Sequence, residues 1–187
     1  DLLAAAREKQ LPYQEEYTNP EHWIHAWGDL ETEPGVGMKL KNDSTSNSAA
    51  VFLDGSAFWQ DYRIDATTQL LSGDRYNLLA RVENGNNYVG CSFERGLMRL
   101  FTVERGESKV LSIFRLPFLR LTDWNRVGLK VEKNTVQCLL NDQLILQNTL
   151  LRGGHDVGGI GFSVFSSDKT TPAILRVGET SVKATGR

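Results

Sequence analysis

Short segments in which apolar and polar residues alternate run through most of this chain, and they constrain its fold more than any other feature. In YRIDATTQL (62–70), Tyr, Ile, Ala, Thr and Leu alternate with Arg, Asp, Thr and Gln. Successive side chains of an extended strand point to opposite faces, so this alternation predicts a half-buried strand. Similar segments recur from Trp23 onward without sustained helical periodicity. The pattern predicts an all-β fold, a two-sheet antiparallel β-sandwich of the jelly-roll kind.

Turn residues divide this region into consecutive hairpins. Ser72-Gly73-Asp74 and the asparagine-rich stretch 83–87 bound the segment YNLLARV, and Asn141-Asp142 breaks the second half of the chain. Such residues favour tight turns, and strands joined by tight turns pair with each other. The glycine-rich stretch 158–161 predicts a bulge or a close backbone approach at the start of a late strand.

The first 19 residues differ in composition from the rest. DLLAAAREKQL is rich in good helix formers, and Pro12 ends the run. We therefore divide the chain into a helical lead-in or linker, residues 1–19, and a β-sandwich domain, residues 20–187.

Charge and hydropathy exclude two classes of partner. The 187 residues carry a formal net charge of −2, and the basic residues are scattered. A nucleic-acid-binding domain or a membrane-surface domain would concentrate basic residues on one face. No apolar run approaches the ~18 residues that a membrane span requires. We expect no nucleic-acid partner and no membrane insertion.

The two cysteines, Cys91 and Cys138, both fall on the apolar side of predicted strands. A disulfide would require their α-carbons to lie within ~7 Å of each other, which the pattern alone does not decide. We favour two buried thiols that pack as small apolar side chains, and the disulfide stays open as the alternative. The spacing does not match a zinc site.

The order of motifs resembles the laminin-G-like and concanavalin A-like jelly rolls that occur as accessory domains of extracytoplasmic carbohydrate-active proteins. The resemblance covers roughly residues 20 to 185 and is carried by four pieces: LLARVENGNNYV, DWNRVGLKV, LLNDQLI and VGGIGF. It implies a periplasmic or secreted location and a polysaccharide or oligosaccharide partner. Family members include sugar-binding modules, enzymes and structural domains, so the fold alone does not choose a function.

We predict that sugar binds the polar sides of the central strands. Aromatic rings stack on sugar rings, and charged or amide groups hydrogen-bond to hydroxyls. The candidate residues are Asn77 and Arg81 on one strand, Tyr88, Ser92 and Glu94 on the next, and Arg99 beyond them. The alternative is a merely solvated sheet in which such residues pair across strands, above all Arg81 with Glu94.

Tryptophans supply further candidates. Trp59 and Trp27 are possible platforms at the edge of the sandwich, although burial is the more common environment for tryptophan. Trp124 opens a predicted apolar strand, and we expect its indole to be a buried structural anchor.

Catalytic residues are not indicated. A glycosidase requires two carboxylates about 5 to 9 Å apart. The concanavalin-like glucanases carry them as Glu-x-Asp-x-Glu, a string that this chain lacks. Its nearest approximations are Glu31-Thr32-Glu33 and the pair Asp61 and Asp65, which we interpret as surface charges.

The sequence gives equally little indication of a metal site. His22 and His25 have helical spacing, but Pro20 and Gly28 leave room for at most one turn. We expect no cofactor and keep a structural calcium ion open. Its candidate oxygen ligands are Asp29, Glu31, Asp54, Asp168 and Glu179, but the closing strand offers Glu179 alone where relatives carry an aspartate pair.

We therefore interpret the chain as a non-catalytic carbohydrate-binding accessory module that binds or orients a polysaccharide for a neighbouring catalytic domain in a longer chain. Two other classes of protein remain as alternatives. A structural or protein-interaction sandwich predicts a flat exposed apolar patch. A glycan-processing enzyme predicts a cleft with two converging carboxylates.

Overall fold

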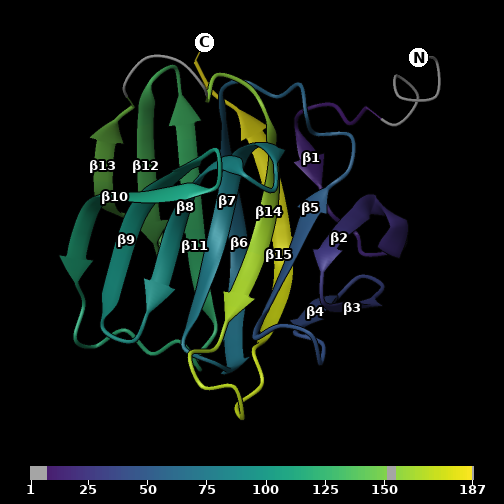
Figure 1. The fold of residues 1–187 in the computed structure, drawn as a ribbon. Helices are drawn as coiled ribbons and strands as arrows, with labels where there is room; N and C mark the ends of the chain where they lie inside the picture. Colours follow the sequence, from purple (N-terminus) through teal and green to yellow (C-terminus); the bar gives the residue numbers. More distant parts are fainter. Residues whose placement is uncertain (1–7, 151–154, 187) are drawn as a thin grey trace.

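Residues 8–150 and 155–186 are described by a computed structural model and form two antiparallel sheets packed face to face (Figure 1). Sheet A contains, in spatial order, β13 (Gln143–Thr149), β12 (Thr135–Leu140), β11 (Asn125–Glu132), β6 (Tyr62–Ser72), β15 (Ile174–Ala184), β4 (Gly37–Lys41) and β3 (Asp29–Glu33), with β1 (Tyr13–Gln14) beside β15. Sheet B contains β10 (Glu107–Arg115), β9 (Leu97–Glu104), β8 (Asn87–Glu94), β7 (Arg75–Asn84), β14 (Gly159–Phe165), β5 (Ser48–Leu53) and β2 (Trp23–Trp27). The predicted fold class, a jelly-roll β-sandwich, is confirmed.

The inner faces of the two sheets share one apolar core. Ile64 and Leu129 of sheet A and Leu78, Phe93 and Phe162 of sheet B are fully buried in it. Burying a side chain of this size contributes about 1.5–3 kcal/mol, so the alternating apolar residues fix which face of each strand turns inward. The polar residues between them therefore point outward, away from the partner sheet. No helix in the described ranges is long and apolar enough to cross a membrane.

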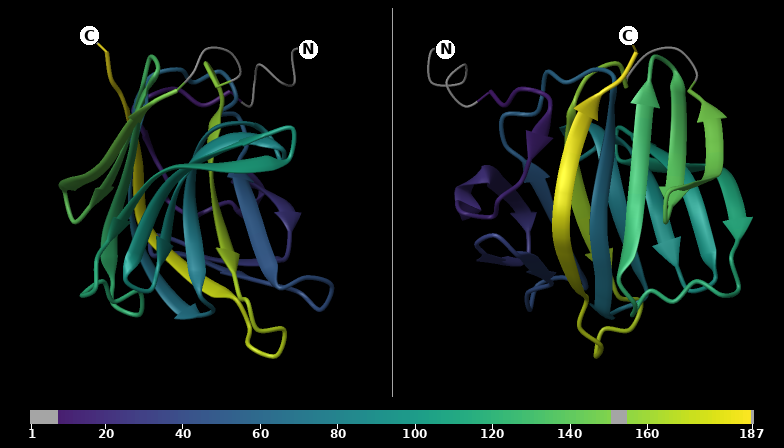
Figure 2. Two further views of the ribbon diagram at one scale, coloured as in Figure 1. Left: turned by 60° about the vertical axis from the view of Figure 1, so that its left-hand side comes forward. Right: turned by 180° about the vertical axis from the view of Figure 1, so that it is seen from behind.

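Two hairpin tips meet at one end of sheet B. The amide of Gly106, in the β9–β10 turn, donates to the carbonyl of Asn86 in the β7–β8 turn at 3.0 Å, and the Arg105 amide donates to Asn87 Oδ1 at 3.1 Å. The β9–β10 hairpin consequently leans across the outer side of the sheet (Figures 1 and 2). Sheet B is thus concave on the side that faces away from the core.

The N-terminal segment is extended where the structure describes it. Residues 1–7, which carry most of the expected helix, lie outside the described residues. Tyr13 and Gln14 form β1 and pair with Val182 and Ser181 of β15. The buried Tyr17 hydroxyl donates to the Gly178 carbonyl at 2.5 Å. A 3-10 helix, η1 (Pro20–His22), then leads into β2. This part of the expected lead-in therefore packs on the sandwich.

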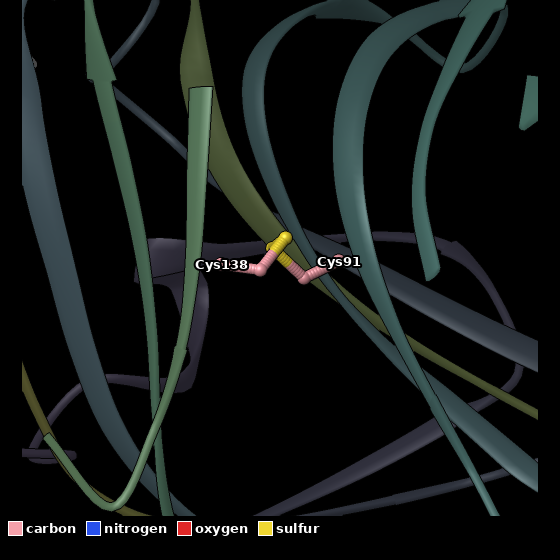
Figure 3. The surroundings of a disulfide bond; sticks show 2 residues. All are labelled: Cys91 and Cys138. Carbon is pink, nitrogen blue, oxygen red and sulfur yellow. A yellow bond between two sulfur atoms is a disulfide. The ribbon is translucent and has the colours of Figure 1, made fainter. Parts of the chain in front are cut away.

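Cys91 and Cys138 form a disulfide, so the favoured interpretation of two free thiols is wrong (Figure 3). Cys91 lies on β8 of sheet B and Cys138 on β12 of sheet A, and their α-carbons are 5.9 Å apart. The bond crosses the core and joins the two sheets. The inward orientation of both cysteines was predicted correctly. Their approach depends on which strands face each other, and this is set by strand order over the whole chain.

We expect loss of this disulfide to destabilise the fold. A cross-link between positions 47 residues apart stabilises a protein by about 2–4 kcal/mol, mainly by restricting the unfolded chain. The double variant Cys91→Ala/Cys138→Ala should therefore lose that much free energy of unfolding in a urea titration. Reducing agent should destabilise the wild-type protein and leave the double variant unchanged. Equal stability of both proteins would contradict the cross-link.

Candidate binding face on sheet B

Strand register aligns four polar side chains across the outer face of sheet B. Ser163 of β14 lies opposite Asn77 of β7, Asn77 lies opposite Ser92 of β8, and Ser92 lies opposite Arg99 of β9. We call these four residues the central row. The structure thus brings together Asn77, Ser92 and Arg99, three of the predicted residues. Ser163 adds a fourth that the sequence reasoning missed, although it follows from the alternation in GIGFSVF.

Hydrogen-bonding capacity in the central row is only partly used. Asn77 Nδ2 donates to Ser163 Oγ at 2.9 Å. Asn77 Oδ1 and Ser92 Oγ are buried and have no hydrogen-bond partner among the described residues. A buried polar atom without a partner costs about 1–3 kcal/mol. Both atoms are covered in this structure, and the members of the central row that a ligand can reach are the half-buried Asn77 and Ser163 and the partly exposed Arg99.

Two arginines hold the predicted Glu94 on the same face. Arg75 Nη1 lies 3.5 Å from Glu94 Oε1, and Arg99 Nη1 contacts the same oxygen. The Arg75 guanidinium also lies over the Phe165 ring, 4.8 Å from its centroid. Both arginine side chains remain about one third exposed. The expected pairing of Glu94 with Arg81 is wrong, because Arg75 and Arg99 are its cross-strand and diagonal neighbours.

An apolar patch adjoins the central row toward the hairpin tips. It consists of Phe52, Leu79, Val82, Tyr88, Phe101 and Val103. Gly90 makes room for it, because a Cβ there would lie 2.5 Å from the Phe101 ring. Tyr88 packs edge to face on Phe101 at 6.2 Å, and burial raises the pKa of its hydroxyl above the ordinary value. The predicted Tyr88 is therefore a neutral, half-buried border of the patch.

Trp27 extends the central row toward the other edge of sheet B. It lies opposite Ala50 of β5, which in turn lies opposite Ser163. Its indole is 39% exposed, and Nε1 donates to Ser48 Oγ at 2.9 Å. With strands ~4.8 Å apart, the five steps from β2 to β9 span about 24 Å. An exposed aromatic ring and a cationic side chain thus stand at opposite ends of the row.

Arg81 does not belong to this face, which corrects the prediction. It is 1% exposed and donates to the carbonyls of Gln60, Lys133 and His155 at 3.1, 2.6 and 2.7 Å. Its guanidinium also pairs with Asp61 at 3.1 Å. The cause is a register shift in the β7–β8 pairing between Ala80 and Asn84, which breaks the alternation. Arg81 joins loops at the end of the sandwich.

Two tryptophan predictions are also corrected. Trp59 is 5% exposed, and its Nε1 donates to the carbonyl of Lys9 at 2.8 Å, so it is not a platform. It packs edge to face on Tyr62 in the core. Trp124, expected to be buried, is 48% exposed on the outer face of sheet A. Both residues lie beside loops, where strand alternation does not predict which way a side chain points.

The carboxylates considered for catalysis do not converge on sheet B. Glu31 pairs with Lys39 on sheet A, Asp61 pairs with Arg81, and Asp65 pairs with Arg63. In the regularly paired parts of β7, β8, β9 and β14, Glu94 is the carboxylate that strand register places on the outer face. No group of three or more His, Cys, Asp or Glu side chains in the described ranges could hold a metal ion.

Comparisons with known proteins identify relatives in structure but not in sequence. No family model matches this chain, and no curated protein matches it significantly. A carbohydrate-binding module, CBM66 from Bacillus subtilis, is similar with a TM-score of 0.72 and 14% identity, over 87% of this chain and 96% of that one. A β-glucanase from Bacillus licheniformis has a TM-score of 0.71 and 11% identity, over 95% and 100% of the two chains.

A third similar structure is the catalytic domain of an endo-1,3-β-glucanase (laminarinase) from Thermotoga petrophila. Its TM-score is 0.65 and its identity 12%, over 96% of this chain and 100% of that one. At such identities the likeness establishes the fold alone. The three proteins include a binding module and two glucanases, so the choice between these activities depends on the residues of this chain.

The roles assigned to Arg81 and Arg99 differ in their consequence for stability. Arg81→Ala should lower the free energy of unfolding by at least about 3 kcal/mol, because three carbonyls and Asp61 lose their donor. Arg99→Ala should change it by no more than about 1 kcal/mol, since the Arg99 pair is partly solvated. Urea titrations of the two variants measure this difference. If the two variants were equally stable, the buried structural role of Arg81 would be wrong.

Proposed function

We propose that this protein is a non-catalytic carbohydrate-binding module that holds a polysaccharide or oligosaccharide against the outer face of sheet B. The observation that carries the proposal is the central row, in which Asn77 Oδ1 and Ser92 Oγ have no hydrogen-bond partner among the described residues and Arg99 lies beside them. Sugar hydroxyls both donate and accept hydrogen bonds, so amide, hydroxyl and guanidinium groups in one row match them.

Apolar groups beside the central row support the same ligand class. A sugar ring has apolar faces that pack on aromatic rings. Trp27 offers a partly exposed indole at one end of the row, and Tyr88 and Phe101 border its side. The row crosses the strands, so an extended chain of sugar units could contact both ends at once. The similarity to CBM66 gives this arrangement a precedent in fold.

The charge environment of Glu94 supports binding without catalysis. Glycoside hydrolysis commonly requires two carboxylates about 5 to 9 Å apart. In the regularly paired parts of β7, β8, β9 and β14, strand register places Glu94 alone among carboxylates on the outer face, and Arg75 and Arg99 occupy its Oε1. This carboxylate is therefore better suited to orient the two arginines than to transfer a proton.

The proposal includes a location and a partner domain. The disulfide between Cys91 and Cys138 favours an oxidising, extracytoplasmic compartment, because the cytosol keeps most thiols reduced. A module of this kind would bind or orient a polysaccharide for a neighbouring catalytic domain in a longer chain. A structural calcium ion stays a separate possibility, which a change in melting temperature with chelator would reveal.

Binding can be tested on a glycan array, followed by isothermal titration with the soluble oligosaccharide of the best polymer. We expect the protein to bind at least one polysaccharide on the array. Asn77→Ala and Arg99→Ala should each weaken binding about tenfold, since each removes a hydrogen bond to the ligand. Lys183→Ala, which removes an exposed cation from sheet A, is the control and should leave the affinity unchanged. Absence of binding to every polymer would favour a structural or protein-interaction domain.

Catalysis can be tested in the same preparation. We expect no release of reducing ends from laminarin or barley β-glucan, because Glu94 has no second carboxylate opposite it on the described strands of this face. A reducing-sugar assay with long incubation measures this, and Glu94→Gln is the matched variant. Hydrolysis that disappears in Glu94→Gln would identify an enzyme and overturn the non-catalytic proposal.

A further inference from the structure

A cavity of about 350 Å³ opens on the outer face of sheet A. Sheet A lies on the opposite side of the sandwich from sheet B, which carries the central row (Figure 2, right). It extends from β3 and β4 across β15 to Leu71 at the end of β6 and to Trp124. Sites for small ligands have volumes of ~300–1,000 Å³, so this cavity is large enough for one. None of the predicted sugar-binding residues lines it, and the proposed function does not use it.

Trp124 forms one wall of this cavity and is held in place. Its loop is fixed to β6 by the Leu70 amide, which donates to the Leu121 carbonyl at 2.8 Å, and by Gln69 Nε2, which donates to the Thr122 carbonyl at 3.0 Å. The Arg176 guanidinium lies 5.1 Å from the centroid of the indole. Tryptophan usually buries most of its surface, yet nearly half of this ring is exposed. The indole is therefore a preorganised aromatic surface.

Gly178 of β15 lies next to the indole. A Cβ at Gly178 would lie 2.5 Å from Thr67 Oγ1 and 3.4 Å from Trp124 Cζ3. A side chain there would collide with Thr67, whereas its distance to the indole is that of an ordinary van der Waals contact. The indole therefore lies beside β15 at this glycine and leaves nearly half of its surface to solvent.

The charged groups of the cavity are balanced in sign. Glu31 and Lys39 form an ion pair at 3.1 Å, and both remain substantially exposed. Strand register places Lys39 between Glu31 and Arg176, and Glu33 lies beside them. Two carboxylates disfavour an anionic ligand, and two cations disfavour a cationic one. A neutral ligand that both donates and accepts hydrogen bonds can use all four groups.

We propose that this cavity is a second carbohydrate site, in which a neutral sugar ring stacks on Trp124 and its hydroxyls bond to Glu31, Lys39 and Arg176. Stacking on an indole and bonding to a charge-balanced rim together select a polyhydroxylated, uncharged ring. The site goes beyond the proposed function and does not depend on it, because the core separates the cavity from the central row. A protein with both sites would contact two chains, or two segments of one chain, on opposite faces.

The four tryptophans allow both faces to be followed in one experiment. In a nitrogen–proton NMR spectrum each indole gives one signal. Trp124 reports on the cavity and Trp27 on sheet B, whereas the buried Trp23 and Trp59 are internal references. Trp124→Phe and Trp27→Phe assign the signals. The probes are laminarihexaose, cellohexaose, xylohexaose and mannohexaose as neutral sugars, and hexagalacturonate as an anionic one.

We expect at least one neutral hexasaccharide to shift the Trp124 signal, with an affinity that is insensitive to salt because the ligand carries no charge. Arg176→Leu should weaken the titration of the Trp124 signal about tenfold. Trp124→Ala removes this reporter, so its loss of binding at the cavity is measured by isothermal titration with the same hexasaccharide. Arg99→Ala should leave the titration of the Trp124 signal unchanged. Urea titrations should find both cavity variants folded, since each side chain lies at the surface.

Three results would overturn the proposal. They are a Trp124 signal that no neutral hexasaccharide moves, a response to hexagalacturonate alone, and a Trp124 response that Arg99→Ala abolishes. The first two reject a neutral sugar in the cavity, and the third places the ligand on sheet B. A Trp124 response that survives in Arg99→Ala, with no effect of Asn77→Ala on any binding, would reject the proposed function and retain the cavity site.

Discussion

The packing of two inner sheet faces on one another is the interaction on which the rest of this structure depends. Each strand commits every second side chain to the core, so the intervening positions lie on one of two outer faces. The core contains fully buried apolar side chains and the disulfide between Cys91 and Cys138. The two proposed ligand sites accordingly lie on the outer faces.

Each outer face carries an aromatic ring beside its proposed ligand surface, but the two rings differ in exposure. On sheet B, Gly90 accommodates Phe101, and that ring becomes part of a mostly buried patch beside the central row. On sheet A, Trp124 lies next to Gly178 and stays half exposed beside a cavity. Charge differs as well. Two arginines share one carboxylate on sheet B, whereas acidic and basic groups are balanced around Trp124.

Wherever a strand is regular, the alternation of apolar and polar residues was sufficient to predict on which face of the sheet a side chain lies. The alternation in YNLLARV and NNYVGCSFE placed Asn77, Ser92 and Glu94 on one face, and the glycine-rich stretch 158–161 correctly predicted a register shift in β14. Arg81 was misplaced because a bulge of this kind also interrupts β7, where no glycine marks it. Every residue after such a shift changes face, so one irregularity is enough to move a side chain from the surface to the interior.

The disulfide and the exposure of Trp124 could not be predicted from the sequence for a different reason. The disulfide requires β8 and β12 to face each other across the core, and 47 residues separate its two cysteines. The exposure of Trp124 depends on how its loop docks on β6. Neither fact is encoded in the residues near it in sequence, because each depends on contacts between segments that are far apart in the chain.

The contacts of Arg81 have a consequence for how this scaffold can vary. Three of its four contacts with the loops are to main-chain oxygens of Gln60, Lys133 and His155, and the fourth is to the Asp61 carboxylate. Main-chain acceptors are present whatever the side chain, so these three hydrogen bonds do not depend on which side chains the loops carry at those positions. One end of the sandwich is thereby secured mainly through the guanidinium of Arg81 and its partner Asp61. New loop sequences could be grafted at that end, and its backbone path would be kept by a residue that lies outside the grafted segments.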